Sequence, residues 1–159
     1  MIDDINPEHH AEILRLNETF VHWLSPLDEA GLIALLGHAS YARQVAGGQA
    51  FLIGYDGNST YRHKNVDWLS ARFESYAYVD RIVVDPSLAG QSVARQLYAD
   101  FERWAGAQGL GWIGCEVNTV PDHPASHAFH VRLGFRPLDD VRYGDKAVRY
   151  YAKPLTPIS

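Results

Sequence analysis

The chain contains a single cysteine, Cys115, in 159 residues. One cysteine excludes an internal disulfide framework and a cysteine-rich zinc site. No apolar run approaches the roughly 18 residues that a membrane-spanning helix needs. The N-terminus, MIDDINPEHH, is acidic and polar where a signal peptide would be basic and then apolar. We therefore expect a soluble, cytoplasmic protein without a membrane partner.

A basic excess is also absent, because the formal net charge is -5. This charge argues against a broad basic face for nucleic acid and favours small molecules or cationic groups as partners. Hydrophobic residues make up 47% and charged residues 21%, which fits a globular chain rather than disorder or a coiled coil. The length and the lack of repeats and linkers predict a single domain over 1–159.

Hydrophobic periodicity predicts an α/β fold with a mixed central sheet flanked by helices. Ser25 is the expected cap of the second helix, and residues 56–72 show no pattern, so we expect an irregular segment there. The predicted helices lie near 7–17, 26–36, 93–109 and 126–133, and the predicted strands near 41–46, 50–55, 73–84, 112–118, 135–141 and 147–153.

The junction from Val84 to Arg95 connects a predicted buried strand to a helix through small residues. Small side chains leave backbone N–H groups free at a helix N-terminus, where phosphate binds readily. The same pattern is typical of an ordinary turn capped by Ser87 or Ser92. It is not a P-loop, because no Gly-Lys-Ser/Thr follows, and a dinucleotide glycine pattern is missing.

The segment from Asp80 to Phe135 resembles the GNAT acetyltransferases. The family pattern is a strand ending V-x-P, a Q/R-x-x-G-x-G/A loop opening a helix, a further strand, and N-x-x-A-x-x-x-Y-x-x-x-G-F. This chain has VDP at 84–86, a loop at 89–94, the strand CEVN, and HPASHAFHVRLGF at 123–135. The order and spacing match, so the resemblance implies a GNAT-like fold.

Two loop positions depart from this pattern. Ala89 stands where the family usually has Gln or Arg, and Ser92 stands where it usually has Gly. An alanine removes a charge-assisted contact to phosphate, and the Cβ of a serine limits how closely a ligand approaches the backbone. Arg95 and Arg132 are candidates to compensate, and a solvated helix face is the alternative role for both.

The resemblance implies acetyl-CoA as the acetyl donor, lying between the strand that ends at Val84 and the strand that holds Glu116. The backbone near Val84 would pair with the pantetheine arm, the following loop would hold the pyrophosphate, and a later helix would border the thiol end. The implied cofactor residues are Ile82, Val83, Val84, Ala89, Gly90, Gln91, Ser92, Val93, Ala94, Arg95, Ser126 and Phe129.

Acetyl transfer to an amine needs a base for the amine and an acid for the departing thiolate. Glu116 is the first candidate base, because similar positions in the ribosomal-protein N-acetyltransferase branch carry a catalytic Glu. Asp80 is the second, and strand parity predicts that it shares a face with Tyr78 and Ile82. An ion pair with an arginine is the alternative role for each carboxylate. Cys115 lies in a predicted buried strand without an activating base, so we expect direct transfer rather than an acetyl-enzyme.

His130 is the candidate acid, because it occupies the place where the family usually has Tyr. A packed, inert histidine is the alternative, with Tyr76, Tyr78 or water supplying the proton. His123 and His127 share its helical spacing, but Pro124 and the lack of an H-E-x-x-H pattern lead us to expect no metal.

The acceptor is expected to be a primary amine of a small molecule or peptide, and its identity stays open. The candidate substrate-binding residues are Asn17, Glu18, Tyr76 and Tyr78, with a solvent role at the helix end and core packing as the alternatives. A non-catalytic acyl-CoA sensor is the alternative function, followed by a structural domain that binds no CoA. The C-terminal strand pair leaves a homodimer open.

Overall fold

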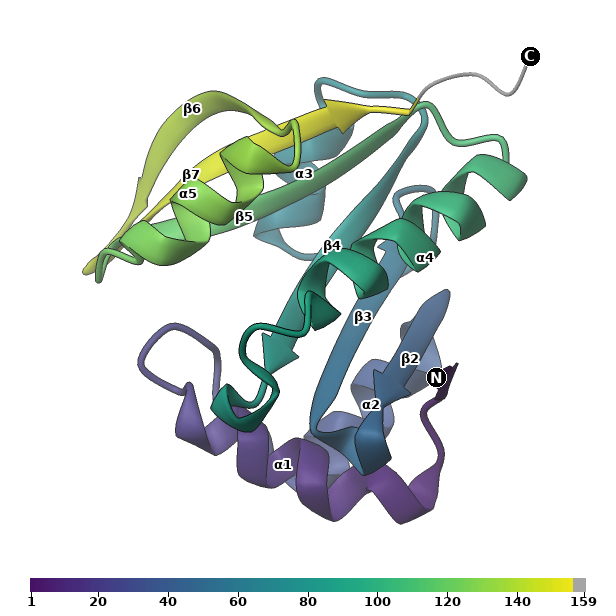
Figure 1. The fold of residues 1–159 in the computed structure, drawn as a ribbon. Helices are drawn as coiled ribbons and strands as arrows, with labels where there is room; N and C mark the ends of the chain where they lie inside the picture. The colour runs from purple at the N-terminus through teal and green to yellow at the C-terminus, as the bar shows by residue number, and fades with distance from the viewer. Residues whose placement is uncertain (156–159) are drawn as a thin grey trace.

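Seven strands form one mixed sheet in the computed structural model, which describes residues 1–155 (Figure 1). The strand order is β1-β2-β3-β4-β5-β7-β6, and β4 and β5 are the parallel pair. The expected α/β fold with a mixed sheet is confirmed. The strands are β1 (Ile2–Asp4), β2 (Tyr41–Val45), β3 (Ala50–Asp56), β4 (Tyr76–Val84), β5 (Trp112–Val120), β6 (Arg136–Tyr143) and β7 (Lys146–Pro154).

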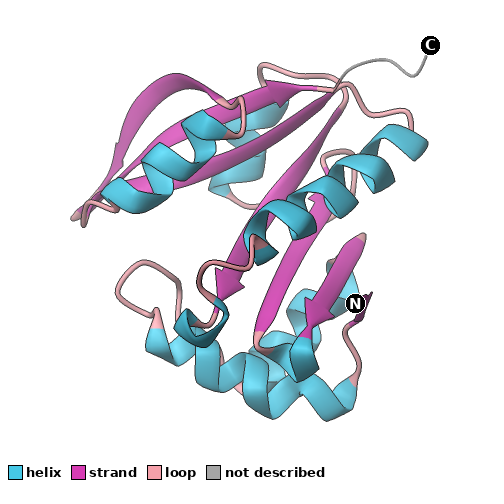
Figure 2. Cartoon of the chain, viewed as in Figure 1, coloured by secondary structure: helices cyan, strands magenta, loops and turns pink. Residues whose placement is uncertain are grey.

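Within residues 1–155, five α-helices cover the two faces of the sheet (Figure 2). They are α1 (His10–Thr19), α2 (Glu29–His38), α3 (Lys64–Ser70), α4 (Val93–Ala107) and α5 (Pro124–Arg132). Helices α4 and α5 pack on one face, where Leu97 and Phe101 of α4 enter the core. The other three helices form a second core on the opposite face, which contains Leu16, Leu32 and Leu69. No helix within residues 1–155 is long and apolar enough to cross a membrane.

Helix α3 lies inside the segment that we expected to be irregular, so that prediction is wrong. The helix has seven residues, of which Val66 and Leu69 are buried in the core and Trp68 is partly buried against it. Three apolar residues within two turns are too few to show a helical period in the sequence. The imidazole Nδ1 of His63 accepts the backbone N–H of Asn65 at 3.1 Å and caps the helix. A histidine cap is not a usual start signal, which is a second reason why the sequence did not reveal α3.

Two expected caps are also corrected. Helix α2 begins after Asp28, whose Oδ1 accepts the N–H of Gly31 at 2.7 Å, so Ser25 is not its cap. At the junction before α4, Asp85 accepts the N–H of Ser87 at 2.9 Å and caps a short 3-10 turn. Ser92 precedes α4 with a left-handed φ of 57° and makes no side-chain cap bond. Both aspartates fit the general preference for a short acceptor side chain at a helix start.

A β-bulge in β4 changes which residues share a face. The register pairs Ile53 with Arg81 and Gly54 with Val79, so Asp80 has no partner across the strands. An inserted residue turns the following side chains to the other face. Tyr78 and Ile82 therefore pack in different cores, and the expectation that Asp80 shares one face with both is wrong.

Gly54 lies at this bulge, where α4 crosses β3 closely. A Cβ at Gly54 would lie 2.6 Å from the ring of Phe101 and 2.8 Å from the carbonyl oxygen of Tyr78. Contacts that short do not occur between real side chains, so only glycine allows the two elements to approach.

Strands β4 and β5 pair over only three positions, from Tyr76 opposite Trp112 to Tyr78 opposite Gly114. Beyond these positions β4 remains paired with β3, and β5 remains paired with β7. Figure 1 shows the two strands diverging from that point. The divergence leaves the facing edges of both strands without a neighbouring strand, which positions the site described next.

Candidate active site

A cavity of about 250 Å³ occupies the space where β4 and β5 diverge. Phe20, Trp23 and Leu24, which follow α1, line it together with residues from β4, β5, α4 and α5. Its remaining lining residues are Val79, Asp80, Arg81, Ile82, Val83, Val84, Tyr98, Cys115, Glu116, Val117, Asn118, His123, Ser126 and His130. The unpaired edge of β4 therefore forms one wall of this cavity. We call it the cofactor-side cavity, because part of the cofactor-binding set expected from the sequence lines it.

Part of the expected cofactor set lies at this cavity. Ile82, Val83, Val84 and Ser126 line it. Of the others, Val93 is buried in the core, and Phe129 packs against that core. The remaining loop residues, Ala89, Gly90, Gln91, Ser92, Ala94 and Arg95, are outside the lining and are exposed except for the half-buried Ala94.

A second cavity of about 560 Å³ lies beside α2, the start of α3 and β4. Tyr61, His63 and Tyr78 are among its lining residues. Asp80, Arg81 and Glu116 line both cavities, so these three side chains form the junction between them. Two molecules that occupy the two cavities would therefore meet at Glu116.

Glu116 projects from β5 toward α3, whereas its neighbours Cys115 and Val117 face the core under α4. The hydroxyl of Tyr78 donates to Glu116 Oε2 at 2.8 Å. Burial raises the pKa of Glu116 to about 8, although the Tyr78 hydrogen bond acts in the opposite direction. A carboxyl group that ionises near the working pH is suited to accept a proton from a substrate.

Asp80 forms an ion pair with Arg81. Arg81 Nε donates to Asp80 Oδ2 at 2.8 Å, and the two side chains are only 8% and 9% exposed. His63 Nε2 lies 3.9 Å from Asp80 Oδ1, and burial lowers the pKa of His63. Of the two candidate carboxylates, Asp80 is therefore the one with an arginine partner.

The four expected substrate-binding residues are not brought together. Tyr78 lines the second cavity, whereas Tyr76 lines neither and donates its hydroxyl to the carbonyl oxygen of Val66 at 2.9 Å. Asn17 is fully buried, and its Oδ1 accepts from Arg81 at 2.8 Å. Glu18 is exposed and lines neither cavity. Asn17 thus helps to orient the guanidinium of Arg81, the ion-pair partner of Asp80.

His130 and Tyr98 form a buried pair at the cofactor-side cavity. His130 Nδ1 lies 2.7 Å from the carbonyl oxygen of Ser126, so this nitrogen carries the proton. His130 Nε2 lies 2.7 Å from the hydroxyl of Tyr98 and accepts its proton in a hydrogen bond. Burial lowers the pKa of His130 and raises the pKa of Tyr98 well above its usual value, so both are neutral at pH 7.

Tyr98 lines this cavity but is not among the residues that the sequence pattern predicted for the site. It lies on the buried stripe of α4, where Leu97, Phe101 and Ala105 are also buried. A hydroxyl on an otherwise apolar helix face needs a buried hydrogen-bond partner. The tyrosine on this face was therefore the feature of the sequence that could have indicated a buried polar site. The partner itself lies 32 residues further along the chain and is not visible in the local pattern.

Cys115 is buried beside this pair, and burial raises the pKa of its thiol well above the usual value. A thiol that stays protonated is a poor nucleophile.

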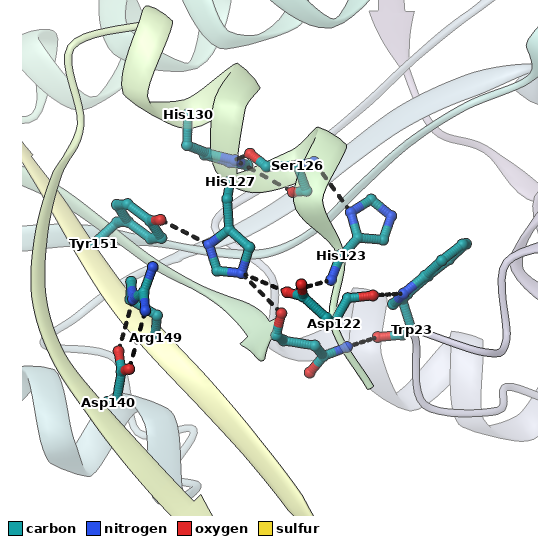
Figure 3. A network of polar contacts seen from close by, with 10 residues as sticks. Trp23, Asp122, His123, Ser126, His127, His130, Asp140, Arg149 and Tyr151 are labelled. Carbon is teal, nitrogen blue, oxygen red and sulfur yellow. Dashed lines mark hydrogen bonds and ion pairs between the residues drawn. The ribbon is translucent and has the colours of Figure 1, made fainter. Parts of the chain in front are cut away.

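His127 of α5 joins a network of polar contacts between α5, β5 and β7 (Figure 3). His127 Nε2 lies 2.9 Å from the carbonyl oxygen of Asn118, and its Nδ1 lies 2.7 Å from the hydroxyl of Tyr151. Trp23 donates its indole N–H to the carbonyl oxygen of Asp122 at 3.0 Å. Within the part of the chain that the structure describes, no three His, Cys, Asp or Glu side chains are grouped to hold a metal ion.

Comparison with known proteins gives one family and many similar folds. The model of the acetyltransferase (GNAT) family matches residues 5–135. The ribosomal-protein-S18-alanine N-acetyltransferase from Escherichia coli has a TM-score of 0.71 and 17% identity, covering 100% of this chain and 96% of that one. Ard1 from Thermoplasma volcanium has a TM-score of 0.76 and 15% identity, covering 98% and 97%.

The NatC complex bound to Gag peptide and CoA is a third similar structure, with a TM-score of 0.70 and 14% identity. The match covers 98% of each chain. No curated protein sequence matches this chain significantly. At these identities the solved structures show a common fold.

Proposed function

Because this chain belongs to the GNAT acetyltransferase family, we propose that it transfers the acetyl group of acetyl-CoA directly to a primary amine of a small molecule or peptide. The observation that carries the proposal is the position of Glu116. Its carboxyl group lies where the cofactor-side cavity meets the second cavity, and its pKa is raised to about 8. A base in that place faces both reacting molecules.

The residues around the cofactor-side cavity suit the donor. The edge of β4 over Ile82–Val84 has backbone groups that would pair with the amides of the pantetheine arm. The loop of Ala89–Arg95 would hold the pyrophosphate, since its small side chains leave the N-terminus of α4 open and its residues are mostly exposed. The NatC complex, which shares the fold, is bound to CoA. The donor supplies an activated thioester.

The proposed reaction begins with the amine in the second cavity. Glu116 accepts a proton from the amine, and the nitrogen forms a bond to the thioester carbonyl carbon. The carbon–sulfur bond then breaks to give the amide and the thiolate of CoA. The thiolate becomes the thiol by recovering, through solvent, the proton that Glu116 took from the amine, which returns Glu116 to its carboxylate form. Asp80 is committed to Arg81, which leaves Glu116 as the carboxylate that is free to act. Direct transfer is favoured because Cys115 remains a thiol.

We place Tyr98 and His130 at the departing sulfur as one unit. The proton on His130 Nδ1 is held by the carbonyl oxygen of Ser126, so the mobile hydrogen of the pair is on Tyr98. The Tyr98 hydroxyl would turn from His130 toward the thiolate and stabilise it by a hydrogen bond. His130 then positions Tyr98 and satisfies its hydroxyl between reactions.

Substitutions in this pair test the assignment. Tyr98→Phe is expected to lower kcat by about a hundredfold with little change in the KM for acetyl-CoA, the size typical of a lost proton donor. His130→Phe should lower kcat by a similar factor, because it removes the anchor of that hydroxyl. Tyr41→Phe is the matched control, since its buried hydroxyl donates to Asp100 at 2.6 Å, away from both cavities. Turnover equal to the control in both variants would assign the pair to packing alone.

The proposed function is tested by calorimetric titration with acetyl-CoA, followed by measurement of thiol release with a panel of primary amines. We expect saturable binding of acetyl-CoA, much weaker binding of ATP, and release of thiol with at least one amine. Desulfo-CoA should bind without supporting transfer. Binding without transfer to any amine would favour an acyl-CoA sensor instead. No binding at millimolar acetyl-CoA would overturn both.

A further inference from the structure

A chain of four hydrogen bonds runs from Glu116 across the interior to the β6–β7 hairpin. Tyr78 donates to Glu116 at 2.8 Å, and Asn65 Nδ2 donates to the Tyr78 hydroxyl at 3.3 Å. Tyr150 donates to Asn65 Oδ1 at 2.6 Å, and the Tyr143 and Tyr150 hydroxyls are 2.6 Å apart. The five residues come from five different elements of the fold.

The hydrogen bonds have one direction. The hydrogen of Tyr150 is used on Asn65, so Tyr143 is the donor to Tyr150. The hydrogen of Tyr78 is used on Glu116, so Tyr78 accepts from the amide of Asn65. Each donor group therefore points toward the carboxyl group. Hydrogen bonds aligned in this way polarise and strengthen one another.

The chain is fixed by its surroundings. Tyr78 and Tyr150 are 1% and 0% exposed, and Asn65 is 9% exposed. The indole of Trp68 stacks on the Tyr150 ring at 4.0 Å with an interplanar angle of 5°. The backbone of Asn65 is held by the His63 cap at the start of α3. Buried polar groups are costly without partners, and this arrangement satisfies all of them.

The inference rests on the proposed role of Glu116 as the base. We propose that Asn65, Tyr150 and Tyr143 are positioning residues, which hold the Tyr78 hydroxyl against Glu116 and stabilise its carboxylate form. The amide of Asn65 interrupts any transfer of protons along the chain, because an amide passes a proton only through its unstable imidic form. The chain therefore orients and polarises the base rather than conducting protons.

The other titratable groups around Glu116 keep a constant charge near the midpoint of its titration, so a shift of that midpoint reports on the hydrogen-bond chain. Asp80 and Arg81 of β4 form an ion pair and together add no net charge. Burial lowers the pKa of both His63, before α3, and His130, on α5, so these imidazoles are neutral above pH 7. Tyr78 and Tyr150, from β4 and β7, have raised pKa values and stay protonated.

The test is a direct titration of the Glu116 carboxyl group by carbon-13 NMR of protein labelled at its glutamates, with Glu116→Gln identifying the resonance. Tyr78→Phe should raise the midpoint by about 1 unit, the effect of losing a charge-assisted hydrogen bond. Tyr150→Phe should raise it by about 0.3 unit, since each neighbouring bond adds roughly 10–30% to the strength of the next. Tyr143→Phe should shift it in the same direction by less.

Tyr76→Phe is the matched control, because it removes a buried hydroxyl that bonds to Val66 beside α3 but lies outside the chain. Its midpoint should equal that of the unmodified protein. The inference would be overturned if the Glu116 midpoint in Tyr150→Phe were unchanged, or if it shifted only as much as the midpoint in the Tyr76→Phe control. The titration needs no acetyl transfer, so a lack of turnover would count against the proposed function and not against the effect of the chain on Glu116.

Discussion

Replacing Glu116 with glutamine is expected to lower kcat by about a hundred- to a thousandfold and to leave the affinity for acetyl-CoA nearly unchanged. Glutamine keeps the shape of the side chain and can accept the Tyr78 hydrogen bond, but it cannot take a proton from an amine. The wall of the cofactor-side cavity that would pair with the donor is formed by β4, which the substitution does not alter. The measurement is thiol release at saturating donor, together with calorimetric titration of acetyl-CoA.

The pH dependence gives this prediction a distinctive sign. With a pKa of about 8, only about a tenth of the Glu116 carboxyl groups are ionised at pH 7. The carboxylate is the form that accepts a proton. The kcat of the unmodified protein should therefore rise with pH in a titration curve whose midpoint lies near pH 8. The residual rate of Glu116→Gln should lack this rise. A profile shared by both proteins would remove Glu116 from the mechanism.

The same pKa also makes a prediction about stability. The carboxyl group of Glu116 titrates higher in the folded chain than the unfolded value of about 4.3. Its contribution to stability is therefore complete below about pH 4.3 and is lost as the pH rises through about 8. Glu116→Gln cannot ionise, so relative to the unmodified protein it should gain stability between pH 6 and pH 9 in urea unfolding. Glu74→Gln, at an exposed position, should show no such gain. A difference between Glu116→Gln and the unmodified protein that is the same at both pH values would contradict the raised pKa.

Local patterns predicted the elements whose burial is periodic. Helix α4 could be predicted because Val93, Leu97, Phe101 and Trp104 recur at helical spacing, and β5 could be predicted because it is a short, largely apolar run. Motif order then identified the family and placed Glu116 on β5. These signals lie within short stretches of sequence, where helix and strand periods are expressed directly.

The missing parts depend on contacts between distant segments. The bulge at Asp80 lies opposite Gly54 of β3, where the ring of Phe101 on α4 leaves no room for a side chain, and no pattern within β4 reveals it. The partners of His130 and Asn65 are likewise far along the chain. Pairing of this kind is decided by tertiary packing, so the sequence could supply candidate polar groups but not their network.

Asp80→Asn is expected to destabilise the fold by about 3 kcal/mol, because it leaves the guanidinium of Arg81 buried without its counter-charge. The two side chains are only 9% and 8% exposed, so solvent screens the unpaired charge weakly. The introduced amide and the amide of Asn17 would still accept hydrogen bonds through their carbonyl oxygens, but neither carries charge. The measurement is urea unfolding at pH 7.

Arg81→Met should destabilise the fold by a similar amount, for the opposite reason that Asp80 is then the unpaired charge. The double variant Asp80→Asn with Arg81→Met should be more stable than the sum of the two single effects predicts, since neither charge remains. Two effects that simply add would show that the ion pair contributes little coupling energy.

Turnover per folded molecule then separates an ion-pair role from a catalytic one. Asp80 raises the pKa of Glu116, so its removal in Asp80→Asn should move the midpoint of the kcat profile to lower pH. The rate at pH 7 should therefore be kept or increased once it is corrected for the folded fraction. A hundredfold loss of kcat in folded Asp80→Asn would instead make Asp80 the base and would assign the carboxyl of Glu116 to positioning, because one amine proton needs one acceptor.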